Sequence, residues 1–450
     1  PEGGRPRVLD PSCGSGHFLV AVVRRFVAGG MPPSEAVACV HGVDVDPVAV
    51  AITQLLLRLE APGCEVEPDV VVGDGLAHRP AESYDVVVGN PPFLGQLRRR
   101  TASARPAGAG AYTDTSALFL RHALDLVVPG GVVGLVQPLS LLAARDAAPV
   151  RGVALERAAI TAFWSSPTAV FPGAAVLTCA PVLRLGERSG PVPTWSGPDF
   201  EPGPTVVLDE LEWGPLAAPS VGIPVVSPQG AGTLADLGSC TADFRDQYYG
   251  LVPFVREGGT GAPLVTSGLI DPAECRWGRR PTRFARTDFE CPTVDLAALR
   301  HDGRLGDWAD RRLVPKVLVA TQGRVIEAVA DPEGAWLPSV PVLTMAPHDP
   351  TDVWRVLAVL LAPPVAAAAA ARYFGTALSA RAIKLSARQV AELPLPVDLV
   401  AWAAGADLAK LAQTGPAGHR PAVLRELARV MGEAYGETAA EAWWIARAGV

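Results

Sequence analysis

Cysteine pairs in the spacing of a metal or redox motif are missing from this chain. Its seven cysteines are scattered, none forms Cys-X-X-Cys, and their number is odd. A disulfide framework and a structural zinc site are therefore not expected, and reduced thiols indicate a cytoplasmic protein without a metal. Long apolar runs and a secretory signal are missing too, so we expect no membrane partner. The alanine-rich stretch at 364–372 is short and predicts a buried helix.

Positive charge is also scarce, because 39 Lys and Arg residues stand against 46 Asp and Glu residues, a net charge of −7. This balance argues against a protein that coats nucleic acid along its whole surface, yet it allows a local basic cleft. A length of 450 residues predicts two or three domains. The sequence starts without Met and reaches a motif within ten residues, so we expect a further N-terminal segment before it.

The first 190 residues alternate short apolar strands with helical segments. Asp46 and Pro47 stand where the N-cap and first position of a helix are expected. Such alternation predicts an α/β fold with a mostly parallel, Rossmann-like sheet, helices on both faces, and a ligand beyond the carboxyl ends of the strands. The strands are expected at 7–10, 40–44, 69–74, 85–90 and 131–138, and the helices at 17–29, 47–60 and 116–127.

Downstream, the composition changes twice. Residues 191–235 are rich in Pro, Gly, Ser and Trp, which predicts an irregular linker after the domain at 1–190. Residues 236–400 hold short strands, loops and clustered arginines, which predicts a second, α+β domain. Residues 401–450 return to helical patterning and are expected to dock on another domain.

The segment DPSCGSGHFL at 10–19 follows a strand and opens a helix. Gly14 and Gly16 allow a sharp turn and a close approach of backbone to ligand. The free N–H groups at the helix start favour a polar or anionic group. No Gly-Lys-Ser/Thr follows, so this is no phosphate-binding P-loop. A glycine-rich turn alone suits dinucleotide and methyl-donor sites equally.

The ends of the next two strands carry carboxylates. Asp44, in GVDVDP, can accept both hydroxyls of a ribose, and Val45 can then lie against an adenine ring. Asp74, in VVGDGL, can accept from an adenine amino group. Each Asp alone could equally be a cap or turn former, but three consecutive strand ends with suitable groups favour a nucleoside site. An NAD site could use Asp44 in the same way, although the full GxGxxG spacing is missing.

Taken in order, the motifs DPSCGSG, GVDVDP, GDGL and GNPPF resemble those of gamma-type S-adenosylmethionine-dependent adenine-N6 DNA methyltransferases of restriction-modification systems. The resemblance is specific over 7–185 and looser over 236–400, where the family has its target-recognition region. It implies S-adenosylmethionine as the cofactor. The residues that the resemblance and the strand ends together assign to the cofactor are Asp10, Ser12, Gly14, Gly16, Asp44, Val45, Asp74 and Gly75.

The same resemblance gives a use to the rigid stretch VVVGNPPFLGQ at 86–96. The side-chain oxygen of Asn90 and the carbonyl of Pro91 would accept both N–H bonds of an amine, and Pro91 and Pro92 would preorganise them. Phe93 would stack on an adenine rotated out of the duplex. By resemblance, Phe171 in VFPGAAVLTC would pack on the other side of that base, unless it is a core residue.

Arginines predict contacts to DNA in two regions. The segment at 97–119 has Arg98, Arg99, Arg100 and Arg105, and is either a phosphate-contacting or a solvated loop. The segment CRWGRRPTRFAR at 275–286 contains no acid and is either a DNA-contacting element or an exposed basic hairpin; its candidate substrate-binding residues are Arg276, Arg279, Arg280 and Arg283. Further candidates are Lys316, Arg324 and Lys384, whereas DFRDQYYG at 243–250 is expected to pack.

These features favour a site-specific DNA adenine-N6 methyltransferase serving restriction-modification or phage defence, with double-stranded DNA and restriction or defence subunits as partners. A methyltransferase acting on protein glutamine or RNA is an alternative, because Asn-Pro-Pro-aromatic can hold other amines and amides. A degenerate specificity subunit is a third reading, against which Asp44, Asp74 and Asn90 argue. The family's segment that closes over the donor's methionine, ahead of the first turn, is missing from this sequence.

Overall fold

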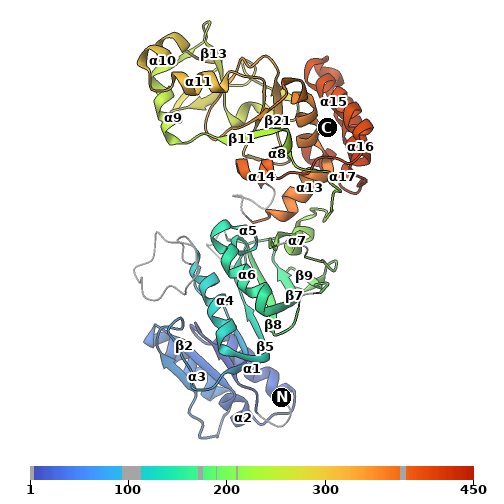
Figure 1. Cartoon of the computed structure of the whole chain (residues 1–450). Helices are drawn as coiled ribbons and strands as arrows, with labels where there is room; N and C mark the ends of the chain where they lie inside the picture. Colours follow the sequence, from blue (N-terminus) through green and yellow to red (C-terminus); the bar gives the residue numbers. More distant parts are fainter. Residues whose placement is uncertain (1–4, 94–112, 171–175, 189, 209–210, 376–381) are drawn as a thin grey trace. The chain divides into compact units, whose positions relative to one another are not determined.

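The computed structural model describes residues 5–93, 113–170, 176–188, 190–208, 211–375 and 382–450 (Figure 1). The chain forms two compact units. Unit 1 comprises Pro1–Val221 with Phe374–Thr376, and unit 2 comprises Gly222–Tyr373 with Ala377–Val450.

Unit 1 is built on a ten-stranded mixed sheet in the order β10-β9-β7-β8-β5-β4-β1-β2-β3, with β6 paired to β8. Five parallel strands form one half of it, namely β1 (Val8–Asp10), β2 (Val40–Asp44), β3 (Asp69–Val72), β4 (Tyr84–Gly89) and β5 (Val127–Leu135). The other half contains β6 (Gln137–Pro138), β7 (Ala158–Ser165), β8 (Thr178–Leu185), β9 (Thr194–Ser196) and β10 (Glu201–Pro202), and β8 runs antiparallel to β5 and β7. The predicted α/β class is confirmed.

Helices of unit 1 cover both faces of this sheet. From β1 the chain moves outward in both directions, so right-handed crossovers place α1 and α3 on one face and α4 and α6 on the other. The Asp46 carboxylate accepts from the Val48 N–H at 2.9 Å and caps α3, as predicted. The helices are α1 (His17–Ala28), α2 (Pro33–Ala38), α3 (Pro47–Leu59), α4 (Thr115–Leu126), α5 (Ser140–Ala143), α6 (Ala148–Arg157) and α7 (Gly214–Ala217).

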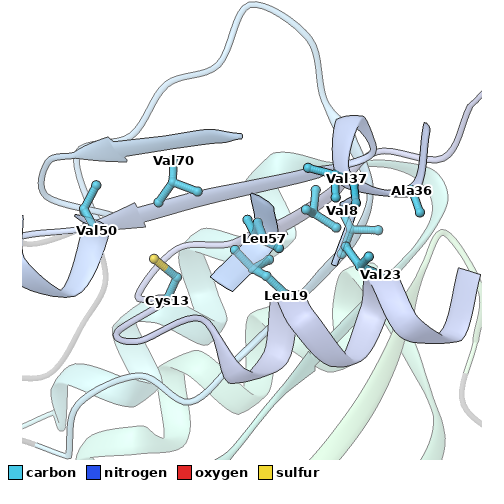
Figure 2. Close-up of a cluster of buried hydrophobic side chains, with 11 residues drawn as sticks. Val8, Cys13, Leu19, Val23, Ala36, Val37, Val50, Leu57 and Val70 are labelled. Atoms are coloured by element: carbon cyan, nitrogen blue, oxygen red, sulfur yellow. The ribbon is translucent and has the colours of Figure 1, made fainter. Parts of the chain in front are cut away.

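The core beneath α1, α2 and α3 is aliphatic. Figure 2 shows one side chain from each helix, Leu19, Val37 and Leu57, in a cluster with Val8 of β1 and Val70 of β3. All five are buried. Because this packing fixes β1, β2 and β3 against the helices, it also fixes the loops at the carboxyl ends of these strands.

The stretch at 191–235, for which an irregular linker was expected, partly belongs to unit 1. Its strand β9 pairs in parallel with β7, and β10 extends the sheet. The buried guanidinium of Arg151 donates to the Leu211 carbonyl at 2.9 Å, which fastens the following residues to α6. Strands of three and two residues are too short to show a period of two in the sequence, and Pro and Gly around them suggest a coil.

Unit 2 combines two four-stranded sheets with helices. One sheet, in the order β11-β23-β19-β21, consists of β11 (Gly238–Ala242), β23 (Leu343–Pro347), β19 (Lys316–Val319) and β21 (Ala328–Asp331). The other, in the order β12-β18-β13-β22, consists of β12 (Val255–Glu257), β18 (Pro292–Val294), β13 (Ala262–Val265) and β22 (Leu337–Pro338). Its longer helices are α12 (Val353–Leu361), α13 (Pro363–Arg372), α15 (Leu399–Thr414), α16 (Arg420–Ala434) and α17 (Glu441–Ala448). Helix α15 packs on α12 and α16, so the C-terminal helices are part of this unit.

Among the described residues, no single helix is long and apolar enough to cross a bilayer. Residues Pro350–Leu361 and Pro363–Arg372 satisfy length and composition only as a pair, and they bend by 58° at the break between them. The buried helix expected at 364–372 lies within α13.

Candidate active site

Polar groups gather where the parallel strands of unit 1 end. Asp10 ends β1, Asp44 ends β2, Asp74 follows β3, and Asn90 follows β4. The order of the strands reverses at β1, which has β2 on one side and β4 on the other. In open α/β sheets, a ligand binds outside the carboxyl ends of the strands at such a reversal. The four residues therefore mark one candidate site.

The glycine-rich turn between β1 and α1 is fixed from two sides. Gly14 and Gly16 have φ angles of 52° and 82°, which L side chains rarely adopt. The Thr53 hydroxyl of α3 donates to the Gly14 carbonyl at 2.7 Å, and a Cβ on Gly16 would lie 2.7 Å from the Thr53 methyl carbon. Within this fixed turn, the buried Ser12 hydroxyl has no hydrogen-bond partner among the described residues.

Asp44 is oriented by backbone donors on both of its oxygens. The Gly14 N–H donates to one oxygen at 2.8 Å, and the Asp46 N–H donates to the other at 3.0 Å. A carboxylate oxygen has two acceptor positions, so each oxygen keeps one for a ligand. The neighbouring Val45 side chain is 69% exposed, which is unusual for valine and leaves an apolar surface beside the carboxylate.

Asp10 is buried between the loop that follows β1 and the loop that follows β4. Its carboxylate accepts from the Ser12 N–H at 3.0 Å. On the other side it touches Gly89, where an added Cβ would lie 2.4 Å from the Asp10 oxygen. Burial raises the pKa of the Asp10 carboxyl to about 7; the Ser12 N–H opposes the rise, and the nearby Asp44 adds to it. The carboxyl thus titrates near neutral pH in direct contact with the residue before Asn90.

The loop that follows β3 lies directly against the loop that follows β1. A Cβ on Gly75 would stand 1.8 Å from the Pro11 carbonyl oxygen, so only glycine fits there. Asp74 accepts from the Leu76 N–H at 2.9 Å and is otherwise exposed at the strand end. The sequence patterns therefore placed Asp74 and Gly75 at the same edge as Asp10 and Asp44, and the structure brings their loops into contact.

Asn90 has a buried side-chain oxygen without a hydrogen-bond partner among the described residues. It is also the only asparagine of the 450 residues, in a chain that uses none at its many turns and helix caps, where asparagine is favoured. The loop is held by the Val136 N–H, which donates to the Gly89 carbonyl at 3.0 Å. Pro91 is buried, Pro92 is exposed and Phe93 is half-buried. Phe171 and Arg98–Arg105 lie outside the described residues.

Two further polar residues at this edge were missed by the sequence predictions. Gln137 of β6 is fully buried and donates to the Ser116 carbonyl at 3.1 Å, while its amide oxygen has no partner in the described structure. Thr178 starts β8, and its buried hydroxyl likewise has none. Because β8 is antiparallel to β5, its start lies at the carboxyl end of β5. The lone Gln after the apolar run GVVGLV was the available signal.

The arginine segment of unit 2 contains no acid of its own, but acids from the preceding hairpin reach it. Arg276 pairs with Asp271, Arg280 lies 3.4 Å from the same carboxylate, and Arg279 lies 3.2 Å from Glu274. These three side chains are therefore partly neutralised. Arg283 differs, because its side chain is 69% exposed and its carboxylate neighbour Asp288 is 4.0 Å away.

Lys316, expected as a DNA contact, is instead buried. Its ammonium group donates to the Asp331 carboxylate at 2.5 Å, and both side chains are almost fully buried between β19 and β21. Burial lowers the pKa of Lys316, and the Asp331 carboxylate opposes this shift. A lysine followed by VLV marks a strand, and strand Lys residues usually face solvent, which is why the sequence misled. Arg324 and Lys384 are exposed.

The described residues contain no group of three or more His, Cys, Asp or Glu side chains placed to hold a metal ion.

The strand order and the polar residues at the strand ends are those of a Rossmann-like sheet with a ligand site at its carboxyl edge. Residues 2–193, which are less than half of the chain, match the model of the family described as N-6 DNA Methylase. This match confirms the predicted resemblance over that part of the chain.

Two curated relatives match parts of the chain. The Type II methyltransferase M.VspI of Vibrio sp. (strain 343) is 30% identical over 129 residues, which are 28% of this chain and 29% of the relative. The ribosomal RNA large subunit methyltransferase G of Streptomyces griseus is 36% identical over 114 residues, which are 25% of this chain and 27% of the relative. The matches thus span less than a third of the length of these relatives.

A solved structure resembles the chain beyond this region. The Type IIL restriction-modification enzyme MmeI, in complex with DNA, has a TM-score of 0.58 at 12% identity, over 98% of this chain and 72% of that chain. At this identity, the similarity concerns the fold alone.

Proposed function

We propose that the protein is a site-specific DNA adenine-N6 methyltransferase of the restriction-modification type. The observation that carries the proposal is the buried Asn90 oxygen, which has no hydrogen-bond partner among the described residues and lies at the strand end beside Asp10, Asp44 and Asp74. A buried acceptor of this kind costs about 1–3 kcal/mol and persists where a ligand satisfies it. An amine that donates an N–H is the ligand it fits.

The residues at the first three strand ends fit S-adenosylmethionine. Two carboxylates with free acceptor positions suit the ribose hydroxyls and the adenine amino group, and the exposed Val45 suits the adenine face. The unpartnered Ser12 hydroxyl and the acidic Asp10 suit the amino-acid end. When bound, the cofactor supplies a strongly electrophilic methyl group. The residues that would hold it are Asp10, Ser12, Gly14, Gly16, Asp44, Val45, Asp74 and Gly75, and no metal enters this proposal.

Asn90 and Pro91 would supply the catalytic groups. The exocyclic amine of adenine is a poor nucleophile, because its lone pair is delocalised into the ring. The Asn90 oxygen and the Pro91 carbonyl would accept hydrogen bonds from the two N–H groups of this amine. These bonds would turn the lone pair out of conjugation and stabilise the positive charge that develops on nitrogen. Pro91 and Pro92 hold these acceptors in place before the substrate arrives.

The adenine must leave the duplex to reach this site. Its extrusion costs a few kcal/mol, and stacking on Phe93 would offset part of this cost. Phe171 is proposed for the opposite side of the base, on the strength of the sequence resemblance alone. Each aromatic ring would also keep water from the amine.

Unit 2 is proposed as the target-recognition part, with double-stranded DNA as the substrate and restriction or defence subunits as partners. The fold similarity to MmeI in complex with DNA supports this assignment. Among the four arginines proposed for DNA binding, Arg283 has the freest guanidinium. Arg276, Arg279 and Arg280 would have to exchange or share their carboxylate partners to reach phosphates.

RNA is the second candidate substrate, because of the 36% identity to the ribosomal RNA methyltransferase. Both substrates present an aromatic exocyclic amine, so the Asn90 site alone does not separate them. DNA is preferred as the substrate because both the similarity to a Type II methyltransferase and the match to the N-6 DNA Methylase family favour it.

Transfer assays separate the two. The purified protein would receive donor labelled in the methyl group together with genomic duplex DNA, ribosomal RNA or a protein extract. Label in the DNA alone supports the proposal. Label in the RNA or protein, with none in the duplex, would overturn it.

A further inference from the structure

Two sequence features meet in unit 2, and the proposed function gives no role to the first of them. One is DFRDQYYG, most of which forms helix α9 (Arg245–Leu251), and the other is the end of the arginine segment, which forms the hairpin of β16 (Thr282–Phe284) and β17 (Thr287–Phe289). The Ala285 N–H donates to the Tyr248 hydroxyl at 2.9 Å. The Tyr248 and Phe284 rings pack with their centroids 4.8 Å apart. Tyr248 thus holds the turn of the hairpin.

This turn has an unusual conformation for its sequence. Phe284 pairs with Thr287, so Ala285 and Arg286 alone form the turn, with φ angles of 49° and 68°. A two-residue turn with both φ angles positive normally contains Asn-Gly or Asp-Gly. A non-glycine residue in this region is strained and persists only where its surroundings enforce it. The hydrogen bond from the Ala285 N–H to the Tyr248 hydroxyl holds the turn in this conformation.

Two other residues of DFRDQYYG, Asp243 and Gln247, fix α9 itself. The buried Asp243 carboxylate accepts from the Trp308 indole N–H at 2.9 Å and from Arg312 at 2.6 Å. The Gln247 side chain accepts from the Phe244 N–H at 2.9 Å and closes the start of the helix. Helix α9, on which the hairpin rests through Tyr248, is therefore held firmly, and Asp243 and Gln247 of the motif make the contacts that hold it.

The rigid arrangement presents cations to the solvent. Arg286 is exposed and makes no ion pair among the described residues, and Arg283 is mostly exposed on the same hairpin. Phe284, by contrast, is buried beneath them. On α9, Phe244 and Tyr249 are 73% and 65% exposed, and Arg245 is exposed between them. Exposed arginines interleaved with aromatics are typical of a nucleic-acid surface.

We propose that the Ala285–Arg286 turn is a DNA-reading element, in which Arg286 contacts a base edge or a phosphate and Tyr248 positions it. This inference rests on the proposed function, since it takes duplex DNA as the substrate. A strained turn fixed in advance suits a reading role, because the loss of freedom on binding has already occurred. Arginine is the side chain most suited to guanine edges and phosphates.

The first test compares Arg286→Ala with Arg425→Ala, which removes an exposed arginine from α16 of the same unit. We expect Arg286→Ala to weaken binding to the duplex DNA that the protein methylates by about 10-fold, which corresponds to the free energy of one arginine contact. If the contact is to a phosphate, the salt dependence of binding should also fall by about one unit of slope. Arg425→Ala should change neither, and kcat at saturating DNA should persist in both variants.

The second test isolates the positioning role of Tyr248. Tyr248→Phe removes only the hydroxyl that holds the turn, and we expect it to weaken DNA binding in the same direction as Arg286→Ala, with unchanged far-UV circular dichroism. Adding Ala285→Gly should restore binding, because glycine adopts the positive φ angle without strain. A purely structural defect would not be rescued in this way.

The outcomes distinguish the two proposals. If the wild-type protein methylates DNA and Arg286→Ala binds DNA as Arg425→Ala does, the hairpin proposal is overturned while the proposed function stands. If the wild-type protein labels RNA rather than any duplex, the proposed function and the assignment of the turn to DNA both fall. Weaker DNA binding by Arg286→Ala, with rescue of Tyr248→Phe by Ala285→Gly, supports the hairpin proposal.

Discussion

Asn90 illustrates how much depends on single atoms at the edge of this sheet. Its oxygen is buried and has no hydrogen-bond partner in the part of the chain that the structure describes, while the backbone around it is held by Gly89 and two prolines. Within the same described part, the buried oxygens of Ser12, Gln137 and Thr178 also lack partners. Buried polar atoms normally find partners, so a group of them in one place is best explained by ligands that donate hydrogen bonds.

Replacement of Asn90 should lower the rate of methyl transfer and leave the affinity for the methyl donor unchanged. We expect Asn90→Ala to lower kcat by about 10²–10³-fold, as does the loss of a preorganised group that stabilises transition-state charge. Asn90→Asp keeps an oxygen acceptor and should retain more activity than Asn90→Ala. Single-turnover transfer assays measure the rates, and calorimetric titration should show unchanged donor affinity. Transfer at the wild-type rate by Asn90→Ala would contradict the assignment.

Asp10 should make the stability of the free protein depend on pH. Its carboxyl ionises near 3.8 when unfolded and near 7 when folded, so between these values the folded protein binds the extra proton. The contribution to stability is therefore full below about pH 4 and is lost as the pH rises to 7, by an amount on the order of 4 kcal/mol. Denaturant titrations of the wild type and Asp10→Asn would measure this, and equal pH profiles would contradict it.

At the scale of elements, the site depends on loops that touch through glycine. We expect Gly75→Ala to destabilise unit 1 by about 3 kcal/mol, because its Cβ would collide with the Pro11 carbonyl. Gly134→Ala is a matched control in β5, where an added Cβ meets no atom within 4 Å. Thermal unfolding of both variants, with donor affinity as a second readout, checks this expectation. A stable Gly75→Ala variant with normal donor affinity would contradict the contact between the loops.

The pair of Lys316 and Asp331 should stabilise β19 and β21 without contacting DNA. Lys316→Ala leaves a buried carboxylate without its partner, which typically costs about 3–5 kcal/mol. Lys384→Ala removes an exposed lysine from the same unit and should leave stability unchanged. Denaturant midpoints of the two variants provide the measurement. A stable Lys316→Ala variant with weakened DNA binding would instead favour the original prediction from the sequence.

The five parallel strands of unit 1 and the helices α1, α3 and α4 were predictable because each carries a local signal. Apolar runs predicted β1 to β5, and the cap at Asp46 predicted the start of α3. Strands β9 and β10 had no such signal, since their pairing is set by β7, far away in the sequence. Likewise, the ion pairs of Arg276, Arg279 and Arg280 depend on Asp271 and Glu274 folding back over them. Contacts made through tertiary structure leave little trace in a local pattern.

At the scale of the whole molecule, one acidic chain contains a polar site in unit 1 and exposed arginines in unit 2. Unit 1 offers carboxylates and buried oxygens that lack partners among its described residues, and these groups suit a cationic donor and an amine. Unit 2 pairs most of its clustered arginines internally and exposes a few on rigid supports. With a net charge of −7, general electrostatic attraction to DNA would be weak, so specific contacts would have to supply the affinity that the proposed reaction needs.

The chemical identity of the methylated product tests this account most directly. Genomic duplex DNA treated with the protein and labelled donor would be digested to nucleosides and analysed by mass spectrometry. The account predicts N6-methyl-2′-deoxyadenosine as the labelled product, and its disappearance with Asn90→Ala. Label on a ring carbon such as that of 5-methylcytosine, or label confined to RNA or protein, would contradict the role of Asn90 as an acceptor for the adenine amine of DNA.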